Sequence, residues 1–147
     1  MIKVEVQFAA SAEDIPSEET LQYWGSQIEN DMEQEVALRI VDEAEMIQLN
    51  EQYRKKSGPT NVLSFPAELP EGVDLSFMGD IIICAPVVAK EAAEQGKTLD
   101  SHWAHMVAHG ILHLQGFDHI DEAEAEQMEG LEIKIMQQLG FANPYDL

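Results

Sequence analysis

Three histidines in the second half of the chain are spaced so that they could hold one metal ion. His109 and His113 are four residues apart, and such positions share one face of an α-helix, so both imidazoles can point at the same spot. Gly116 can adopt a positive φ and end this helix, which would bring His119 back to that spot. Three neutral imidazoles leave a fourth coordination position open, as in catalytic zinc sites. The pattern therefore predicts a catalytic metal centre.

The choice of ligands needs an argument, because all five histidines lie between positions 102 and 119. His105 and His113 are separated by about 12 Å along a helix, whereas an imidazole nitrogen lies only about 2 Å from a bound zinc. These two side chains therefore cannot share one ion. The reversal of the chain after Gly116 favours His109 with His113 over His105 with His109. We interpret His105 as a packing residue or a neighbour of the ligands, and a chance cluster of histidines is the alternative.

The same spacing is similar to that of the metzincin proteases, H-E-x-x-H-x-x-G-x-x-H, with one departure. In zincins the glutamate after the first ligand is the general base that activates water, and Gly110 occupies that position here. The motif thus favours a metal-dependent hydrolase that is not a standard peptidase. Asp118 is a candidate base or partner of a ligand, although an aspartate beside a turn is as often structural.

The charge of the chain restricts its partners. It has 147 residues with 28 acidic and 8 basic side chains, for a net charge of −20. Such a surface repels nucleic acid and anionic membranes, which argues against a general RNA or DNA binder. Arg54, Lys55 and Lys56 are consecutive, however, and form a basic segment that is a candidate for phosphate contact. The alternative is a solvated helix end.

Composition also bounds the class of protein. No apolar run approaches the roughly 18 residues of a membrane span, and the first residues alternate apolar and polar types instead of forming a signal peptide. We therefore expect one domain over residues 1–147, in the cytoplasm and without membrane contact. Cys84 is the only cysteine, which excludes an intramolecular disulfide and a cysteine-based zinc site. Its apolar neighbours predict a core position.

The elements that must position these residues alternate along the chain. Apolar periodicity predicts strands at 2–8, 35–41, 61–65 and 80–85, the last covered on both faces. Capping patterns predict helix starts at Ser17, at Asp42, at Thr98 or Asp100, and at Asp121, with a further helix from Pro86 to about Gln95. This order indicates an α+β or α/β/α domain and leaves the strand order open.

Each of the longer helices has an apolar stripe that should face the core. The predicted buried positions are Leu21, Trp24 and Ile28, then Met46, Leu49 and Tyr53, then Trp103, Met106, Val107 and Ile111, and finally Met128, Leu131, Ile135 and Leu139. The helix that starts at Asp42 should end near the basic segment, because cations stabilise the negative end of a helix dipole.

Four stretches of the chain resemble the YbeY family of bacterial rRNA-maturation endoribonucleases. They are residues 49–54, 58–66, 79–81 and 109–119, which follow the family's order. The histidine motif with Gly110 in place of glutamate and the run from Pro59 to Pro66 are the specific parts of this resemblance. After Arg54 the chain has Lys-Lys-Ser, where the family usually has Gly-Lys-Asp.

The resemblance implies a fold, an activity and a site. The fold would be α+β, a single domain with a small mixed sheet of about four strands flanked by helices and the metal site at the end of a central helix. The activity would be metal-dependent cleavage of single-stranded RNA. His109, His113 and His119 match the family's zinc ligands, for one ion, although other divalent metals accept imidazole as well. Arg54 and His113 are then the expected catalytic residues.

The resemblance further implies a task in ribosomal RNA processing, including maturation of the 3′ end of small-subunit rRNA, and in ribosome quality control. The expected partners are single-stranded ribosomal RNA, ribosomal particles, ribosomal proteins and a ribosome-associated GTPase. On the residue patterns described above, we expect Arg54, Lys55 and Lys56 to contact substrate phosphate, and Asp118 and His105 to support the ligands. Two alternatives stay open, namely a metalloprotease-like hydrolase and a non-catalytic, metal-containing ribosome assembly factor.

Overall fold

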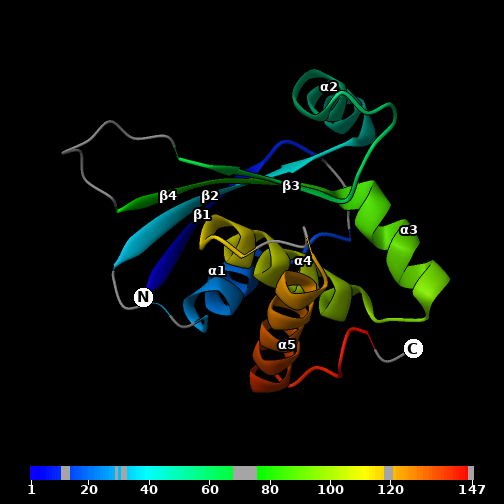
Figure 1. Ribbon diagram of the computed structural model, residues 1–147. Coiled ribbons are helices and arrows are strands. Elements are labelled where there is room, and N and C mark those ends of the chain that lie inside the picture. The colour runs from blue at the N-terminus through cyan, green and yellow to red at the C-terminus, as the bar shows by residue number, and fades with distance from the viewer. Residues whose placement is uncertain (11–13, 29, 31–32, 68–75, 118–120, 146–147) are drawn as a thin grey trace.

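The computed structural model describes residues 1–10, 14–28, 30, 33–67, 76–117 and 121–145. Strands and helices alternate in the first part of the chain, and its last part consists of three consecutive helices (Figure 1). In chain order the elements are β1 (Ile2–Phe8), α1 (Glu18–Ser26), β2 (Gln34–Val41), α2 (Glu43–Arg54), β3 (Val62–Pro66), β4 (Phe77–Cys84), α3 (Ala85–Gln95), α4 (Leu99–Leu114) and α5 (Glu122–Gln138). The predicted α+β class is confirmed.

The four strands form one sheet in the order β1-β2-β4-β3. β1, β2 and β4 run parallel, whereas β3 is antiparallel to β4, so the sheet is mixed as predicted. Ile81 and Ile83 of β4 belong to the larger core, and Ile82 and Cys84 belong to the smaller core on the other face. The second half of this strand is therefore covered on both faces, and β3 is left as the outer edge of the sheet next to it.

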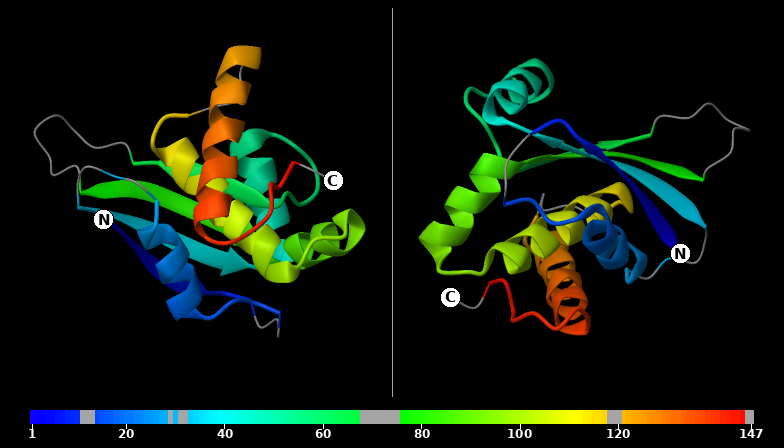
Figure 2. Two further views of the ribbon diagram at one scale, coloured as in Figure 1. Left: turned by 90° about the horizontal axis from the view of Figure 1, so that it is seen from below. Right: turned by 180° about the vertical axis from the view of Figure 1, so that it is seen from behind.

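The helices are distributed unequally over the two faces. α1 and α4 cover one face of the sheet, and α5 packs on α4 on the side away from the strands (Figures 1 and 2). Of the described helices, α2 alone lies on the opposite face (Figure 1). The larger core lies between the sheet and α4, where the Trp103 side chain is completely buried. No helix within the described ranges is long and apolar enough to cross a membrane.

The helix ends follow the predicted capping signals. Four N-cap side chains accept a hydrogen bond from a backbone N–H in the first turn, namely those of Ser17, Asp42, Thr98 and Asp121. α3 has Pro86 in its first turn and ends at Gly96, which is in the left-handed region with φ 66°. These predictions are confirmed because a cap depends only on residues within one turn of the helix end.

Two predictions about the elements are wrong. The Tyr53 side chain is 57% exposed. The buried residues of α2 are Met46 and Asn50, and the last turn of the helix, which carries Tyr53, extends beyond the core. β4 begins at Phe77 instead of residue 80, because Phe77 and Gly79 already pair with β2, and Gly79 also pairs with Pro66 of β3. In both cases pairing or packing between distant segments outweighs the local pattern.

Candidate functional site

α4 places two of the predicted metal ligands beside each other. Thr98 caps this helix, and Trp103, Val107 and Ile111 are buried in the core and hold the helix against the sheet. His109 and His113 lie on another side of α4, with their ring centroids 4.7 Å apart. Spacing by one helical turn therefore brings the two imidazoles together as predicted.

α4 ends at the predicted glycine. Gly116 has a φ of 104°, a conformation that favours glycine. Its N–H donates to the carbonyl of His113 at 3.0 Å, and the N–H of Phe117 donates to the carbonyl of Leu112 at 3.1 Å. This pair of bonds is a Schellman motif, which ends the helix and satisfies its last carbonyls.

Two predicted site residues follow this turn, the third ligand His119 and the candidate base Asp118. Both lie outside the described residues. Among the residues that are described, no set of three ligand-type side chains is placed to hold a metal ion. The three-histidine site therefore stays a prediction, of which the structure describes the two members on α4.

A cleft of about 450 Å³ connects these histidines with the basic segment. It lies between α4 and the edge strand β3, and its lining residues are Arg54, Thr60, Asn61, Val62, Leu63, Ser64, Phe65, His109 and His113. Arg54, at the end of α2, thus reaches the same cleft as the two imidazoles. Lys55 and Lys56 are exposed and are not among the lining residues.

The turn after α2 is held by a buried amide. Asn50 is only 3% exposed, and its Nδ2 donates to the carbonyl of Gly58 at 2.8 Å. Lys55 ends the helix in the left-handed region with φ 57°. The hydrogen bond from Asn50 ties the last turns of α2 to the loop that leads into β3, and so fixes the position of Arg54 at the cleft. Sequence reasoning did not identify this role of Asn50.

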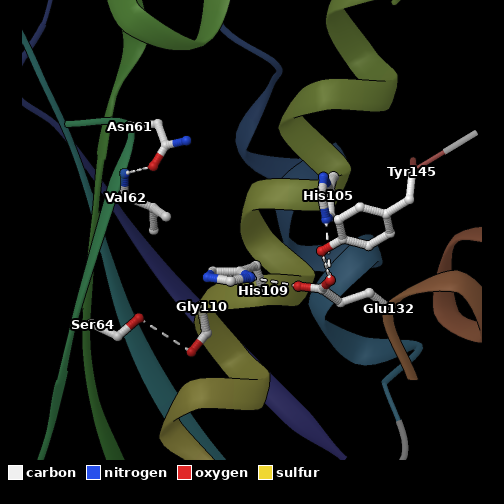
Figure 3. A network of polar contacts seen from close by, with 8 residues as sticks. All are labelled: Asn61, Val62, Ser64, His105, His109, Gly110, Glu132 and Tyr145. Atoms are coloured by element: carbon white, nitrogen blue, oxygen red, sulfur yellow. Dashed lines mark hydrogen bonds and ion pairs between the residues drawn. The ribbon is translucent and has the colours of Figure 1, made fainter. Parts of the chain in front are cut away.

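The wall formed by β3 is tied to the helices by polar contacts. The Ser64 hydroxyl donates to the carbonyl of Gly110 at 3.4 Å, which joins β3 to α4 (Figure 3). Asn61 donates to Glu91 of α3 at 3.0 Å, and the same carboxylate is 2.9 Å from Nε2 of His102. His102 of α4 is therefore linked through Glu91 of α3 to Asn61, the residue before β3. These contacts fix the width of the cleft beside His109.

The site contains a buried carboxylate that the sequence analysis missed. Glu132 of α5 is completely buried, and its Oε1 is 2.5 Å from Nδ1 of His109. Its Oε2 is 3.4 Å from Nε2 of His105 and accepts a hydrogen bond from the Tyr145 hydroxyl. Figure 3 shows the His109 ring between this carboxylate and β3. The predicted supporting residue His105 thus contacts Glu132.

The protonation of this network follows from its contacts. Burial would raise the pKa of Glu132, but hydrogen bonds to His105, His109 and Tyr145 outweigh it and hold the pKa below its usual range. Burial and the bond to Glu132 raise the pKa of Tyr145, so its hydroxyl stays protonated. An ionised Glu132 favours the His109 tautomer with its proton on Nδ1 and its lone pair on Nε2.

These residues fit a divalent metal bound by imidazole nitrogens. A ligating histidine in proteins almost always donates its other ring N–H to a carboxylate, a carbonyl or water, as His109 can to Glu132.

One sequence signal could have revealed the buried carboxylate of Glu132. Glu132 lies four residues after Met128 and three before Ile135, inside the apolar stripe of α5, where an acidic residue needs a partner.

Comparison with known proteins identifies the family. The sequence profile of the family described as Endoribonuclease YbeY matches residues 4–140. The chain belongs to the YbeY endoribonuclease family. This membership confirms the resemblance that the histidine motif and the run from Pro59 to Pro66 suggested.

Two relatives and one solved structure are similar to this YbeY family member. An "Endoribonuclease YbeY" of Alteromonas mediterranea is 54% identical over 136 residues, which are 90% of this chain and 86% of the relative. Another, from Methylococcus capsulatus, is 55% identical over 136 residues, which are 92% of this chain and 91% of the relative. The solution structure of a Thermotoga maritima protein has the same fold, with a TM-score of 0.59 and 24% identity over 100% of both chains.

Proposed function

We propose that this protein is a metal-dependent endoribonuclease that hydrolyses single-stranded RNA in the cleft between α4 and β3. One observation carries the proposal, namely that Arg54 and the pair His109 and His113 line the same cleft although they are far apart in the sequence. Imidazoles suit a metal, and a guanidinium suits the phosphate of an anionic substrate. Membership in a family of hydrolytic nucleases supports this assignment.

We assign the metal to His109, His113 and His119, and zinc is the ion that three imidazoles favour. When bound, it supplies Lewis acidity toward a phosphoryl oxygen or water. Glu132 orients His109 and keeps its Nε2 lone pair available. Arg54 can hold the scissile phosphate with two N–H donors and stabilise the charge that grows in the transition state. Lys55 and Lys56 can attract the flanking phosphates from outside the cleft.

We further propose that the substrate is ribosomal RNA, including the 3′ end of the small-subunit RNA, and that the enzyme acts in ribosome quality control in the cytoplasm. The family resemblance supports this task. A net charge of −20 disfavours tight non-specific RNA binding. Substrate selection would then depend on docking to basic ribosomal proteins in ribosomal particles, with a ribosome-associated GTPase as a further partner.

The two alternative functions have no observation in their favour. For a protease, a glutamate would be needed at Gly110, but a Cβ there would lie 2.9 Å from Cγ2 of Ile81, so this position faces the sheet and not the cleft. For a non-catalytic assembly factor, a metal with an open position would have no purpose. Removal of metal that leaves the protein folded would argue for catalysis, and unfolding would argue for a structural role.

The proposal is tested by cleavage of single-stranded ribosomal RNA and by metal analysis of the same preparations. We expect Arg54→Ala to lower the cleavage rate about 100- to 1,000-fold while metal content is unchanged, by analogy with loss of an oxyanion-hole donor. His113→Ala should lose both cleavage and metal. Lys90→Ala, which removes an exposed cation on α3, is the matched control and should cleave normally.

The opposite result would overturn the proposal. If Arg54→Ala and His113→Ala cleave RNA as fast as the unaltered protein, or if strong chelator has no effect, the activity belongs to a contaminating nuclease. Digestion of unfolded protein in a chelator-sensitive manner would instead support the protease alternative.

A further inference from the structure

A pair of aromatic rings, Tyr53 exposed and Phe65 partly buried, lies next to the cleft, on the face of the sheet that carries α2. The Tyr53 and Phe65 ring centroids are 5.2 Å apart, with an angle of 64° between the ring planes. Tyr53 is 57% exposed, so this contact covers only part of its surface. Leaving a large ring open to water on one side has no benefit for folding. The pair therefore offers an unused stacking surface.

The pair borders a second cavity, of about 360 Å³, which shares the lining residue Phe65 with the proposed active site. Tyr53 and Phe65 line it together with Leu49, Arg39, Asp80 and Ile82. Phe65 also lines the cleft that contains the histidines, and Arg54 directly follows Tyr53 at the end of α2. A chain that passes the edge strand β3 can thus contact the cleft, Arg54 and the aromatic pair in succession.

We propose that Tyr53 and Phe65 form a subsite that stacks one unpaired nucleobase of a single-stranded RNA substrate whose neighbouring phosphate is held by Arg54. The inference rests on the proposed endoribonuclease function and adds a base-binding residue pair to it. Proteins that bind single strands combine cationic contacts to the backbone with aromatic rings on which the bases stack. A duplex cannot use such a subsite, because its bases are already stacked and paired.

The charges around the second cavity favour a base over a phosphate. Arg39 donates two hydrogen bonds to the Glu45 carboxylate, from Nε at 2.6 Å and from Nη2 at 3.0 Å. This ion pair offsets the positive charge of the guanidinium. Asp80 is paired in register with Phe65 and is exposed. Its carboxylate repels phosphate and can accept hydrogen bonds from the amino and imino groups of a base edge. An uncharged ring with N–H donors is therefore the ligand that fits.

The experiment measures both binding and cleavage of one labelled single-stranded oligoribonucleotide. It is repeated with the same oligoribonucleotide carrying abasic nucleotides on both sides of the scissile phosphate. Binding is followed by fluorescence anisotropy at low temperature, before turnover. Tyr53→Ala removes the stacking surface, and Tyr53→Trp retains it. Tyr23→Ala is the matched control, because Tyr23 is 56% exposed but lies on α1, on the opposite face of the sheet.

We expect Tyr53→Ala to weaken binding and raise KM for the normal RNA about fivefold or more, the effect typical of one lost stacking contact. Tyr53→Trp should restore affinity, and Tyr23→Ala should change nothing. The unaltered protein should lose the same factor on the abasic RNA, and Tyr53→Ala should lose nothing more there, because the base and the ring act as one pair.

Two results would overturn the subsite. One is normal binding and KM for Tyr53→Ala. The other is an equal loss on normal and abasic RNA, which would indicate a structural role or a protein-docking role for Tyr53. Failure of the proposed endoribonuclease function can be distinguished from failure of the subsite. If the proposed function is wrong, the unaltered protein cleaves neither RNA, whatever binding the Tyr53 variants show. Absence of any RNA binding would overturn both.

Discussion

At the scale of single residues, Glu132 determines how the histidines of α4 can be used. One carboxylate is in contact with His105, His109 and Tyr145, which lie on α4 and in the segment after α5. A buried charge is tolerated only with several hydrogen-bond partners, so these contacts explain why an acidic residue can occupy the core side of α5. The same contacts orient His109 toward β3.

Replacing this carboxylate should weaken metal binding more than it alters the fold. In Glu132→Gln the uncharged amide no longer stabilises the Nδ1–H tautomer of His109, and we expect affinity for zinc to fall about 10- to 100-fold. Competition with a fluorescent chelator measures this affinity. Glu126→Gln, an exposed change on the same helix, is the control. Equal zinc affinity in both variants would show that Glu132 does not support a ligand.

At the scale of elements, local signals were sufficient to predict where helices begin and end. The cap residues Ser17, Asp42, Thr98 and Asp121 and the turn at Gly116 act within one helical turn, so the sequence contains all the information they need. The extent of burial along α2 was predicted less well. Tyr53 follows the apolar spacing of a core residue but lies in the last turn of the helix, and only packing against the sheet decides how far along a helix burial extends.

Two glycines inside helices should respond in opposite ways to substitution by alanine. Gly130 of α5 has open space around the position of a Cβ, so Gly130→Ala should raise the free energy of unfolding by about 0.5–1 kcal/mol. A Cβ on Gly110 of α4 would lie 2.9 Å from Cγ2 of the buried Ile81. Gly110→Ala should therefore lower stability by about 1–3 kcal/mol.

Urea unfolding of the two variants beside the unaltered protein measures both effects. The pair is informative because each change has the same intrinsic effect on helix propensity, and only the packing differs. Stabilisation by Gly110→Ala would mean that α4 can move away from β4, and the close approach of α4 to the sheet would not be required for the cleft.

At the scale of the whole molecule, the negative net charge of the chain disfavours binding of the anionic substrate proposed for its site. The net charge is −20, yet the proposed substrate is a polyanion. In the proposed site, Arg54 and the predicted metal ligands would attract phosphate within one cleft at the edge of the sheet. Elsewhere the acidic surface repels RNA and favours basic protein partners. Selection of the RNA substrate would thus depend on the protein partner to which the enzyme docks, and cleavage would take place in the cleft.

The same charge should make stability depend on salt. Raising ionic strength from about 0.01 M to about 0.15 M shortens the screening length from about 30 Å to about 8 Å and weakens repulsion among the carboxylates. We therefore expect the midpoint of urea unfolding to rise with sodium chloride. The combined variant Glu51→Gln with Glu126→Gln, both exposed, should show a smaller rise. A midpoint that falls with salt would indicate that ion pairs outweigh the repulsion.

The sequence by itself determined the features that depend on neighbouring residues. The spacing of His109 and His113, the capping of the helices and the helix end at Gly116 follow from the geometry of one helical turn. The histidine motif with its glycine at position 110, together with the run from Pro59 to Pro66 and two shorter stretches, was sufficient to indicate the family, which the profile over residues 4–140 confirms.

Only the tertiary structure decided which distant residues meet. The strand order β1-β2-β4-β3 makes β3 an edge strand beside α4, and this arrangement brings Arg54 of α2 to His109. The burial of Glu132 and the exposure of Tyr53 likewise depend on packing between helices and sheet. Local patterns cannot encode these contacts, because each is fixed by the combined burial of apolar surface across the whole fold.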